Sequence, residues 1–93
     1  MSNQEERETI FTIYDLKADE IMKIPHVMRC GVDFAEDGRH QIRVAVIKGG
    51  EEEAKVKVQA LLENVVVKLK NGSNKSLPPD SWIVKIQPPY RYY

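Results

Sequence analysis

The stretch VMRCGVDFAEDGRHQIRVAVI, residues 27–47, decides the fold because apolar and polar side chains alternate on both sides of a turn. Alternation over about four to eight residues is typical of a half-buried β-strand. The stretch therefore predicts an antiparallel β-hairpin with one buried face. The residues expected on that face are Met28, Cys30, Val32, Phe34, Ile42, Val44 and Val46.

The length of the loop in this hairpin sets which residues face each other. A two-residue loop would place Asp33 opposite Ile42 and so put a carboxylate on the apolar face. A three-residue loop pairs Ala35 with Arg39 instead, and every apolar residue then meets an apolar or amphipathic one. Gly38 stands where a type I turn with a G1 bulge needs a left-handed residue. The sequence therefore predicts the three-residue loop.

The rest of the chain predicts two helices and three strands around the hairpin. Residues 9–14 are rich in β-branched and aromatic side chains, which favours a strand. Asp15 is suited to cap a helix, and Pro25 ends it because the residue before a proline avoids the helical region. Three glutamates after Gly50 favour a second helix through the helix dipole. The expected ranges are strand 9–14, helix 15–24, hairpin 27–46, helix 51–62, strand 65–70 and strand 82–87.

Up to residue 70 these elements follow the order β-α-β-β-α-β, which is the signature of the split βαβ or ferredoxin-like unit. We therefore expect an α+β fold in which an antiparallel sheet carries two helices on one face. Residues 82–87 would be an extra C-terminal edge strand, paired with the strand before it. The 93 residues suffice for a single domain. Residues 1–8 are expected to be disordered and residues 88–93 to form a C-terminal tail.

Charge and cysteine content narrow the possible functions. Fourteen basic and fourteen acidic side chains cancel, so no overall field attracts nucleic acid or an anionic membrane. A single cysteine forms no internal disulfide. No apolar run approaches the ~18 residues of a membrane-spanning helix, and the polar N-terminus lacks the features of a signal peptide. A cytoplasmic location and no membrane partner are therefore expected.

Cys30 is the first candidate for a catalytic nucleophile, and it needs a base within hydrogen-bond reach. The histidines are His26 and His40, and in the predicted hairpin each lies about 13 Å from Cys30, at ~3.3 Å per residue of strand. One cysteine and two histidines also fall short of a zinc ligand set. The sequence therefore predicts no catalytic residue, no metal site and no cofactor.

The expected element order resembles that of RNA-recognition motif domains, which stack bases on aromatic side chains of two central strands. Residues 41–47, in the place of the third strand, contain no aromatic residue. A nucleic acid would therefore have to be held by basic side chains of the sheet face. Those residues are Arg29, Arg43, Lys68, Lys70 and Lys85. Nucleic-acid binding is the second function hypothesis.

The first hypothesis is a non-enzymatic interaction module that forms a homodimer or binds a protein partner. It would use the sheet face that the helices leave uncovered, or a sheet edge, because exposed apolar patches often mark interaction sites. The tail Pro-Pro-Tyr-Arg-Tyr-Tyr adds residue types common in interfaces. A third hypothesis, a small enzyme, would use Asp33, Arg43 and Tyr14. The candidate surface residues are Phe11, Arg29, Arg43, Ala45, Ile47, Val66, Lys68, Ile83, Lys85, Tyr90, Arg91 and Tyr92.

Overall fold

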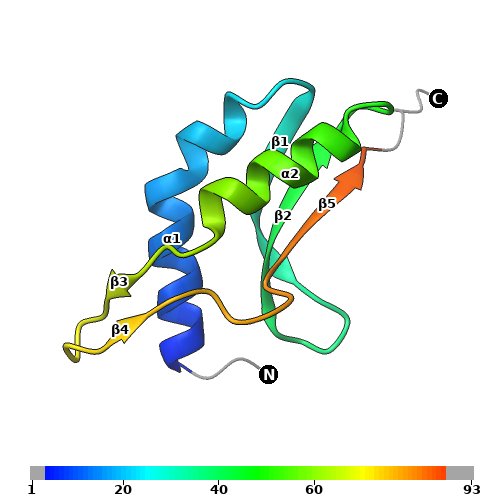
Figure 1. Cartoon of the computed structure of the whole chain (residues 1–93). Coiled ribbons are helices and arrows are strands. Elements are labelled where there is room, and N and C mark those ends of the chain that lie inside the picture. Colours follow the sequence, from blue (N-terminus) through cyan, green and yellow to red (C-terminus); the bar gives the residue numbers. More distant parts are fainter. Residues whose placement is uncertain (1–3, 88–93) are drawn as a thin grey trace.

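A computed structural model describes residues 4–87 of the chain. Its elements are α1 (Gln4–Met22), β1 (Val27–Phe34), β2 (His40–Val46), α2 (Glu51–Leu62), β3 (Val67–Lys68), β4 (Asn74–Lys75) and β5 (Trp82–Ile86). Figure 1 shows the two helices beside a mixed sheet with the strand order β1-β2-β5, while β3 and β4 pair separately. The described residues therefore form a small α+β domain around one core.

The loop between β1 and β2 is the predicted three-residue loop. The Ala35 N–H donates to the Arg39 carbonyl at 2.8 Å, and the Gly38 N–H donates to the Ala35 carbonyl at 2.9 Å. Gly38 has a φ of 86°, a left-handed conformation that glycine adopts without the steric cost of a Cβ. The local turn chemistry therefore sets the register of the hairpin, as the sequence predicts.

The pairing along this hairpin confirms the predicted register at three positions, Phe34–His40, Val32–Ile42 and Cys30–Val44. The fourth predicted pair is wrong. A bulge between Val27 and Arg29 makes Val27, rather than Met28, the partner of Val46. A bulge adds one unpaired residue to its strand, so Met28 stands half exposed at 50% instead of facing the core.

The first element is a helix, so the prediction of a strand over residues 9–14 is wrong. α1 runs without interruption through this range and through residues 4–8, which were expected to be disordered. The buried side chains Thr9, Ile10, Ile13 and Ile21 follow helical spacing. Burying this stripe outweighs the strand preference of a few β-branched residues. The Thr9 hydroxyl also bonds within the helix, donating to the Glu5 carbonyl at 2.7 Å.

The last strand lies at the sheet edge as predicted, but its partner differs. β5 is parallel to β2, with Val84 opposite Val44, and does not pair with the strand that precedes it. The strand expected over residues 65–70 is reduced to β3, which pairs with β4 in a range predicted to be a loop. A parallel neighbour requires a long crossover, and α2 supplies it. The described residues therefore do not form the ferredoxin-like order.

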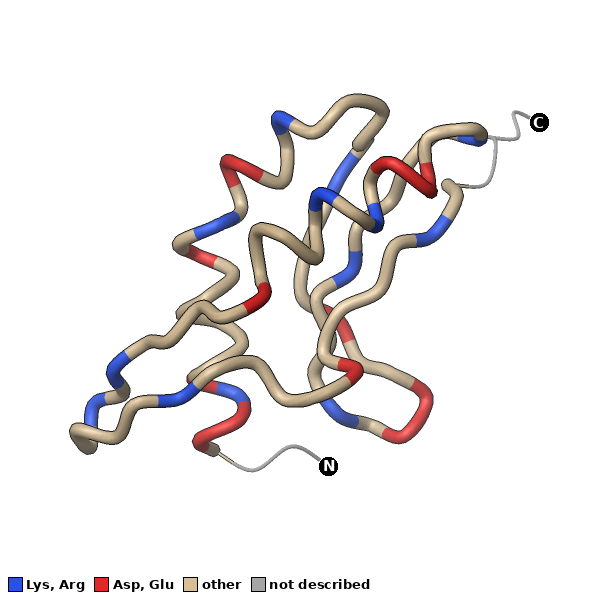
Figure 2. Tube along the Cα trace, in the orientation of Figure 1, with Lys and Arg blue, Asp and Glu red and all other residues tan. Residues whose placement is uncertain are grey.

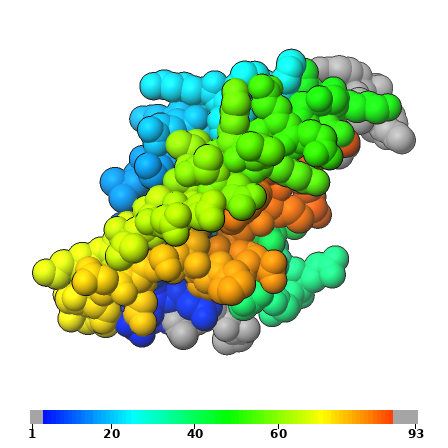
Figure 3. Space-filling view, in the orientation of Figure 1, coloured from blue at the N-terminus to red at the C-terminus, as the bar shows by residue number. Residues whose placement is uncertain are grey.

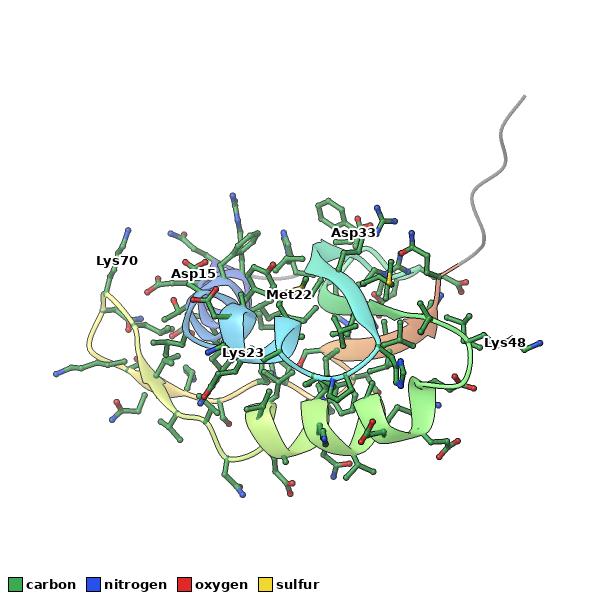
Figure 4. The ribbon with its side chains drawn as sticks, turned by 90° about the horizontal axis from the view of Figure 1, so that it is seen from above. Asp15, Met22, Lys23, Asp33, Lys48 and Lys70 are labelled. Carbon is green, nitrogen blue, oxygen red and sulfur yellow. The ribbon has the colours of Figure 1, made fainter. Side chains whose placement is uncertain are left out.

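Both helices pack on one side of the sheet, as Figure 4 shows from above. α1 contacts β1 and β2, and α2 contacts β5. Between them, Ile42, Val44 and Val46 of β2 are each at most 1% exposed. The intervening residues of β2 point to the opposite face and are only half-buried. Neither described helix is long and apolar enough to cross a bilayer.

Substitutions on α1 test the helix that replaces the predicted strand. Ile13 is 0% exposed and Leu16 is 61% exposed. Ile13→Ala is expected to lower the free energy of unfolding by about 2–5 kcal/mol, because it leaves a cavity in the core. Leu16→Ala is the matched control and should change it by no more than about 0.5 kcal/mol. Urea unfolding measures both, and equal losses would contradict the inward placement of Ile13.

Candidate functional site

The three-stranded sheet has two edges, at β1 and at β5. An edge strand presents backbone N–H and C=O groups that a further strand can use, and proteins either block such an edge or bind through it. Backbone groups alternate along each strand between the neighbouring strand and the outside. The two edges of this sheet can therefore be compared group by group.

The β1 edge is blocked by contacts within the chain. The Tyr14 hydroxyl of α1 donates to the outward carbonyl of Cys30 at 3.2 Å. The outward N–H of Phe34 donates to the Asp33 carboxylate at 2.8 Å. The bulge at Met28 adds a local twist at the other end of the strand. These three features protect β1 against the addition of a strand.

Within residues 4–87, no contact protects the β5 edge in this way. The Gln87 N–H donates to the Val46 carbonyl at 2.7 Å, so odd-numbered residues of this segment bond to β2. Trp82, Val84 and Ile86 therefore direct their backbone groups away from β2, and no hydrogen bond within residues 4–87 reaches these groups. Among the described residues, this edge is therefore left unpaired and open to a further strand. Figure 3 shows β5 at the surface between α2 and the hairpin turn.

A hollow of about 430 Å³ lies beside the start of this free edge. It opens between the C-terminal end of α2 and the segment that leads into β5. Its lining mixes apolar and polar side chains. The apolar ones are Leu62, Leu77, Pro78 and the half-buried Trp82, and the polar ones are Gln59, Glu63, Asn64, Ser76 and Asp80. Val66, one of the predicted surface residues, lines the same hollow and is 61% exposed. An apolar side chain of a strand added to β5 would find room here.

The sheet face opposite the helices forms a second hollow, of about 500 Å³. Strand pairing sets two rows across it, Arg29–Ala45–Lys85 and Gly31–Arg43–Ile83. The hollow is deepest at Gly31, which has no side chain to fill it. A Cβ added there would meet no atom within 4 Å. The hollow is thus a shallow depression between long basic side chains that come from three strands.

The positive charge of this hollow is only partly balanced. Asp33 is the one acidic residue in its lining, and its Oδ2 lies 3.7 Å from Nη1 of Arg43, with side chains 62% and 39% exposed. An exposed pair of this kind contributes about 0–1 kcal/mol. The buried Nε of Arg43 and the buried Oε1 of Gln87 have no hydrogen-bond partner within the described chain. Leaving such a buried polar group unpaired costs about 1–3 kcal/mol.

The open face brings together five of the sequence-predicted surface residues, namely Arg29, Arg43, Ala45, Ile83 and Lys85. Phe11 lies on α1 instead, with its ring 5.6 Å from that of His40, because the segment that carries it is helical. Val66 lies just before β3 and Lys68 within it, and Ile47 follows β2 as an exposed side chain. Tyr90, Arg91 and Tyr92 lie outside the described residues.

The basic residues of the nucleic-acid hypothesis occupy two separate places. Arg29, Arg43 and Lys85 lie on the open face, whereas Lys68 and Lys70 lie in and just after β3. Figure 2 shows the basic positions of the β3–β4 pair at the opposite end of the molecule from those of the sheet. The hypothesis stays a prediction, and its two groups of cations do not form one continuous track.

Sequence reasoning missed two residues of the open face, Gly31 and Gln87. Gly31 interrupts the side-chain alternation of β1, and an isolated glycine in a strand often marks a close approach of another molecule. That signal could have identified the depression. Gln87 follows Ile83 and Lys85 in the alternation of residues 82–87, which places it on the same strand face, but its burial depends on β5 pairing with β2.

Tyr14 and Cys30 meet on the helix side of the sheet. The Tyr14 hydroxyl lies 3.5 Å from the Cys30 Sγ, and Cys30 is half-buried against the core. The hydrogen bond with Cys30 raises the pKa of Tyr14 to about 12, and burial and the charges of Cys30 and Asp15 act in the same direction. Asp33 and Arg43 lie on the other face, so the three residues of the enzyme hypothesis do not form one site.

Comparisons with known proteins give no information on the function of this chain. No family model matches it, and no curated protein or solved structure is significantly similar to it. Among residues 4–87, no group of three His, Cys, Asp or Glu side chains is placed to hold a metal ion. The candidate sites are thus the free β5 edge with its hollow, and the basic hollow of the open face.

The raised pKa of Tyr14 predicts a loss of stability at alkaline pH. An unfolded tyrosine ionises near pH 10, and folded Tyr14 ionises only near pH 12. Its contribution to the free energy of unfolding is therefore complete below about pH 10 and falls as the pH rises towards 12. Absorbance at 295 nm should show a late-titrating tyrosine that Tyr14→Phe removes. Cys30→Ala should lower its midpoint towards 10, and an unchanged midpoint would contradict the role of Cys30.

Proposed function

We propose that this chain is a non-enzymatic interaction module that takes up an additional strand at the free edge of β5, from a second copy or from a protein partner. The observation that supports this most is the outward backbone groups of Trp82, Val84 and Ile86, which have no partner within residues 4–87. In strand addition, main-chain hydrogen bonds supply affinity and side-chain pockets supply specificity. The blocked β1 edge directs such an addition to one side of the sheet.

A second copy of the chain can pair antiparallel with this edge without bringing like charges together. When Val84 faces Val84 of the second copy, Trp82 faces Ile86 and Ile83 faces Lys85, so no like charges meet. The next register towards the C-terminus places Lys85 opposite Lys85, which is unfavourable. The favourable register would join the two sheets into a continuous one about a two-fold axis.

A strand from a protein partner would use the same backbone groups. It would also pass the hollow of about 430 Å³ at the start of β5. An apolar side chain of the partner could enter between Leu62 and the half-buried Trp82. Partial burial of such a side chain contributes a fraction of the ~1.5–3 kcal/mol of full burial, which would favour partners that carry an apolar residue at this position.

Proline at position 86 tests strand addition at β5. Ile86 is exposed, and its N–H points away from β2, so Ile86→Pro removes an outward donor without removing a β2 bond. Ile86→Thr is the matched control, because it keeps the N–H and a β-branched side chain. We expect light scattering to show dimers at high concentration for the wild type and Ile86→Thr, and monomers for Ile86→Pro.

Amide hydrogen exchange identifies the edge that is used. The amides of Trp82, Val84 and Ile86 should exchange rapidly in dilute protein and become protected as the dimer forms. A chain that stays monomeric removes the second-copy version of the proposal. The partner version then requires that extended peptides selected from a random library protect the same three amides. Selected peptides that protect other amides, or no selectable peptide, would contradict the proposal as a whole.

A further inference from the structure

The hollow on the open sheet face has the size and construction of a small-molecule site. Its volume of about 500 Å³ lies within the range of roughly 300–1,000 Å³ that is usual for ligand pockets. Its floor is made by Gly31 and Ala45, which occupy neighbouring rows on β1 and β2. The sheet holds these positions in place through two sets of strand hydrogen bonds, so the depression is present before a ligand binds.

The basic side chains around this floor come from three different strands. Arg29 lies on β1, Arg43 on β2 and Lys85 on β5, and Arg29 and Lys85 flank Ala45 in one row. Adjacent strands lie ~4.8 Å apart, so the two flanking backbones stand about 10 Å from each other. Side chains of this length can close from both sides on a group that sits above Ala45. Within residues 4–87, neither Arg29 nor Lys85 has an ion pair of its own.

Two buried polar atoms indicate which chemistry the ligand would bring. The Nε of Arg43 is a donor without an acceptor, and the Oε1 of Gln87 is an acceptor without a donor, within the described chain. Buried polar atoms without partners are few in native proteins, and each calls for a partner. After a small shift of each side chain, a phosphate oxygen would satisfy the Nε of Arg43, and a hydroxyl group on the same ligand would satisfy the Oε1 of Gln87.

We propose that this hollow binds a small phosphorylated molecule that carries a hydroxyl group, with its phosphate between Arg29, Arg43 and Lys85. Three cations against the single carboxylate of Asp33 suit a doubly charged phosphate better than a singly charged carboxylate. Arginine presents a planar fork of donors that matches phosphate oxygens. This site is separate from the β5 edge, because the side chains of the open face stand perpendicular to the edge groups.

The same observations disfavour a nucleic-acid strand as the occupant. The residues that line the hollow include no aromatic side chain on which a base could stack. Lys68 and Lys70, which would extend a phosphate track, lie by β3 at the other end of the molecule. The positive charge of the open face is therefore confined to the hollow, which has the size of a small ligand.

Titrations followed by amide chemical shifts test the site. The probes are ribose 5-phosphate, inorganic phosphate, uncharged ribose and a short oligothymidine strand. We expect ribose 5-phosphate to shift the amides of Gly31, Ala45 and Gln87 and to bind more tightly than inorganic phosphate, and ribose not to bind. Arg43→Gln should raise the Kd for ribose 5-phosphate about tenfold, as expected for one charged hydrogen bond.

Two further variants separate a built site from a merely basic surface. Gly31→Val keeps every charge but fills the floor, and the added Cβ meets no atom within 4 Å, so the fold should tolerate it while binding is lost. Lys57→Gln removes a cation of α2 that is paired with Glu53 at 3.3 Å, and it should leave the Kd unchanged. Three results would overturn the proposal. Gly31→Val could bind ribose 5-phosphate as tightly as the wild type does, oligothymidine could bind more tightly than ribose 5-phosphate, or neither phosphate probe could bind.

Discussion

The strand β2 is the constraint on which the rest of the structure depends, because it is hydrogen-bonded on both sides and buried on one face. Its odd-numbered residues bond to β1 and its even-numbered residues to β5. Ile42, Val44 and Val46 are each at most 1% exposed beneath the helices. The register of β2 therefore sets both sheet edges, the core and the open face at once, and a one-residue slip would exchange the two faces.

The two candidate surfaces follow from this position of β2. Pairing on both sides leaves free edges only at β1 and β5, and the contacts of Tyr14 and Asp33 then block the first of them. The outward side chains of β2, Arg43 and Ala45 among them, form the middle of the open face. The β5 edge thus offers backbone hydrogen-bonding groups, whereas the open face of the sheet offers charged side chains. The two can act independently because they use different groups of β5.

Local patterns predicted the hairpin correctly, together with the face of the hairpin on which Arg29 and Arg43 lie. The three-residue loop follows from Gly38 and from the alternation beside it, because both act over a few residues. The start of α2 at Glu51 also agrees with the sequence. Arg29 and Arg43 could be placed on one face from alternation alone. Gly31 belongs to the same face. The alternation of apolar and polar side chains does not reveal it, because glycine has no side chain, whereas its place inside a strand does mark the position.

The sequence by itself determined the hairpin, its register from the turn to Cys30 and which side chains of β2 are buried, since turn geometry and alternation act between near neighbours. Only the tertiary structure decided that residues 9–14 are helical and that β5 lies parallel to β2. Ile10 and Ile13 suit a strand as well as a helix, and the choice depends on the apolar surface that they meet across the core. Likewise, Val84 is buried beside Val44 because the crossover through α2 carries β5 there.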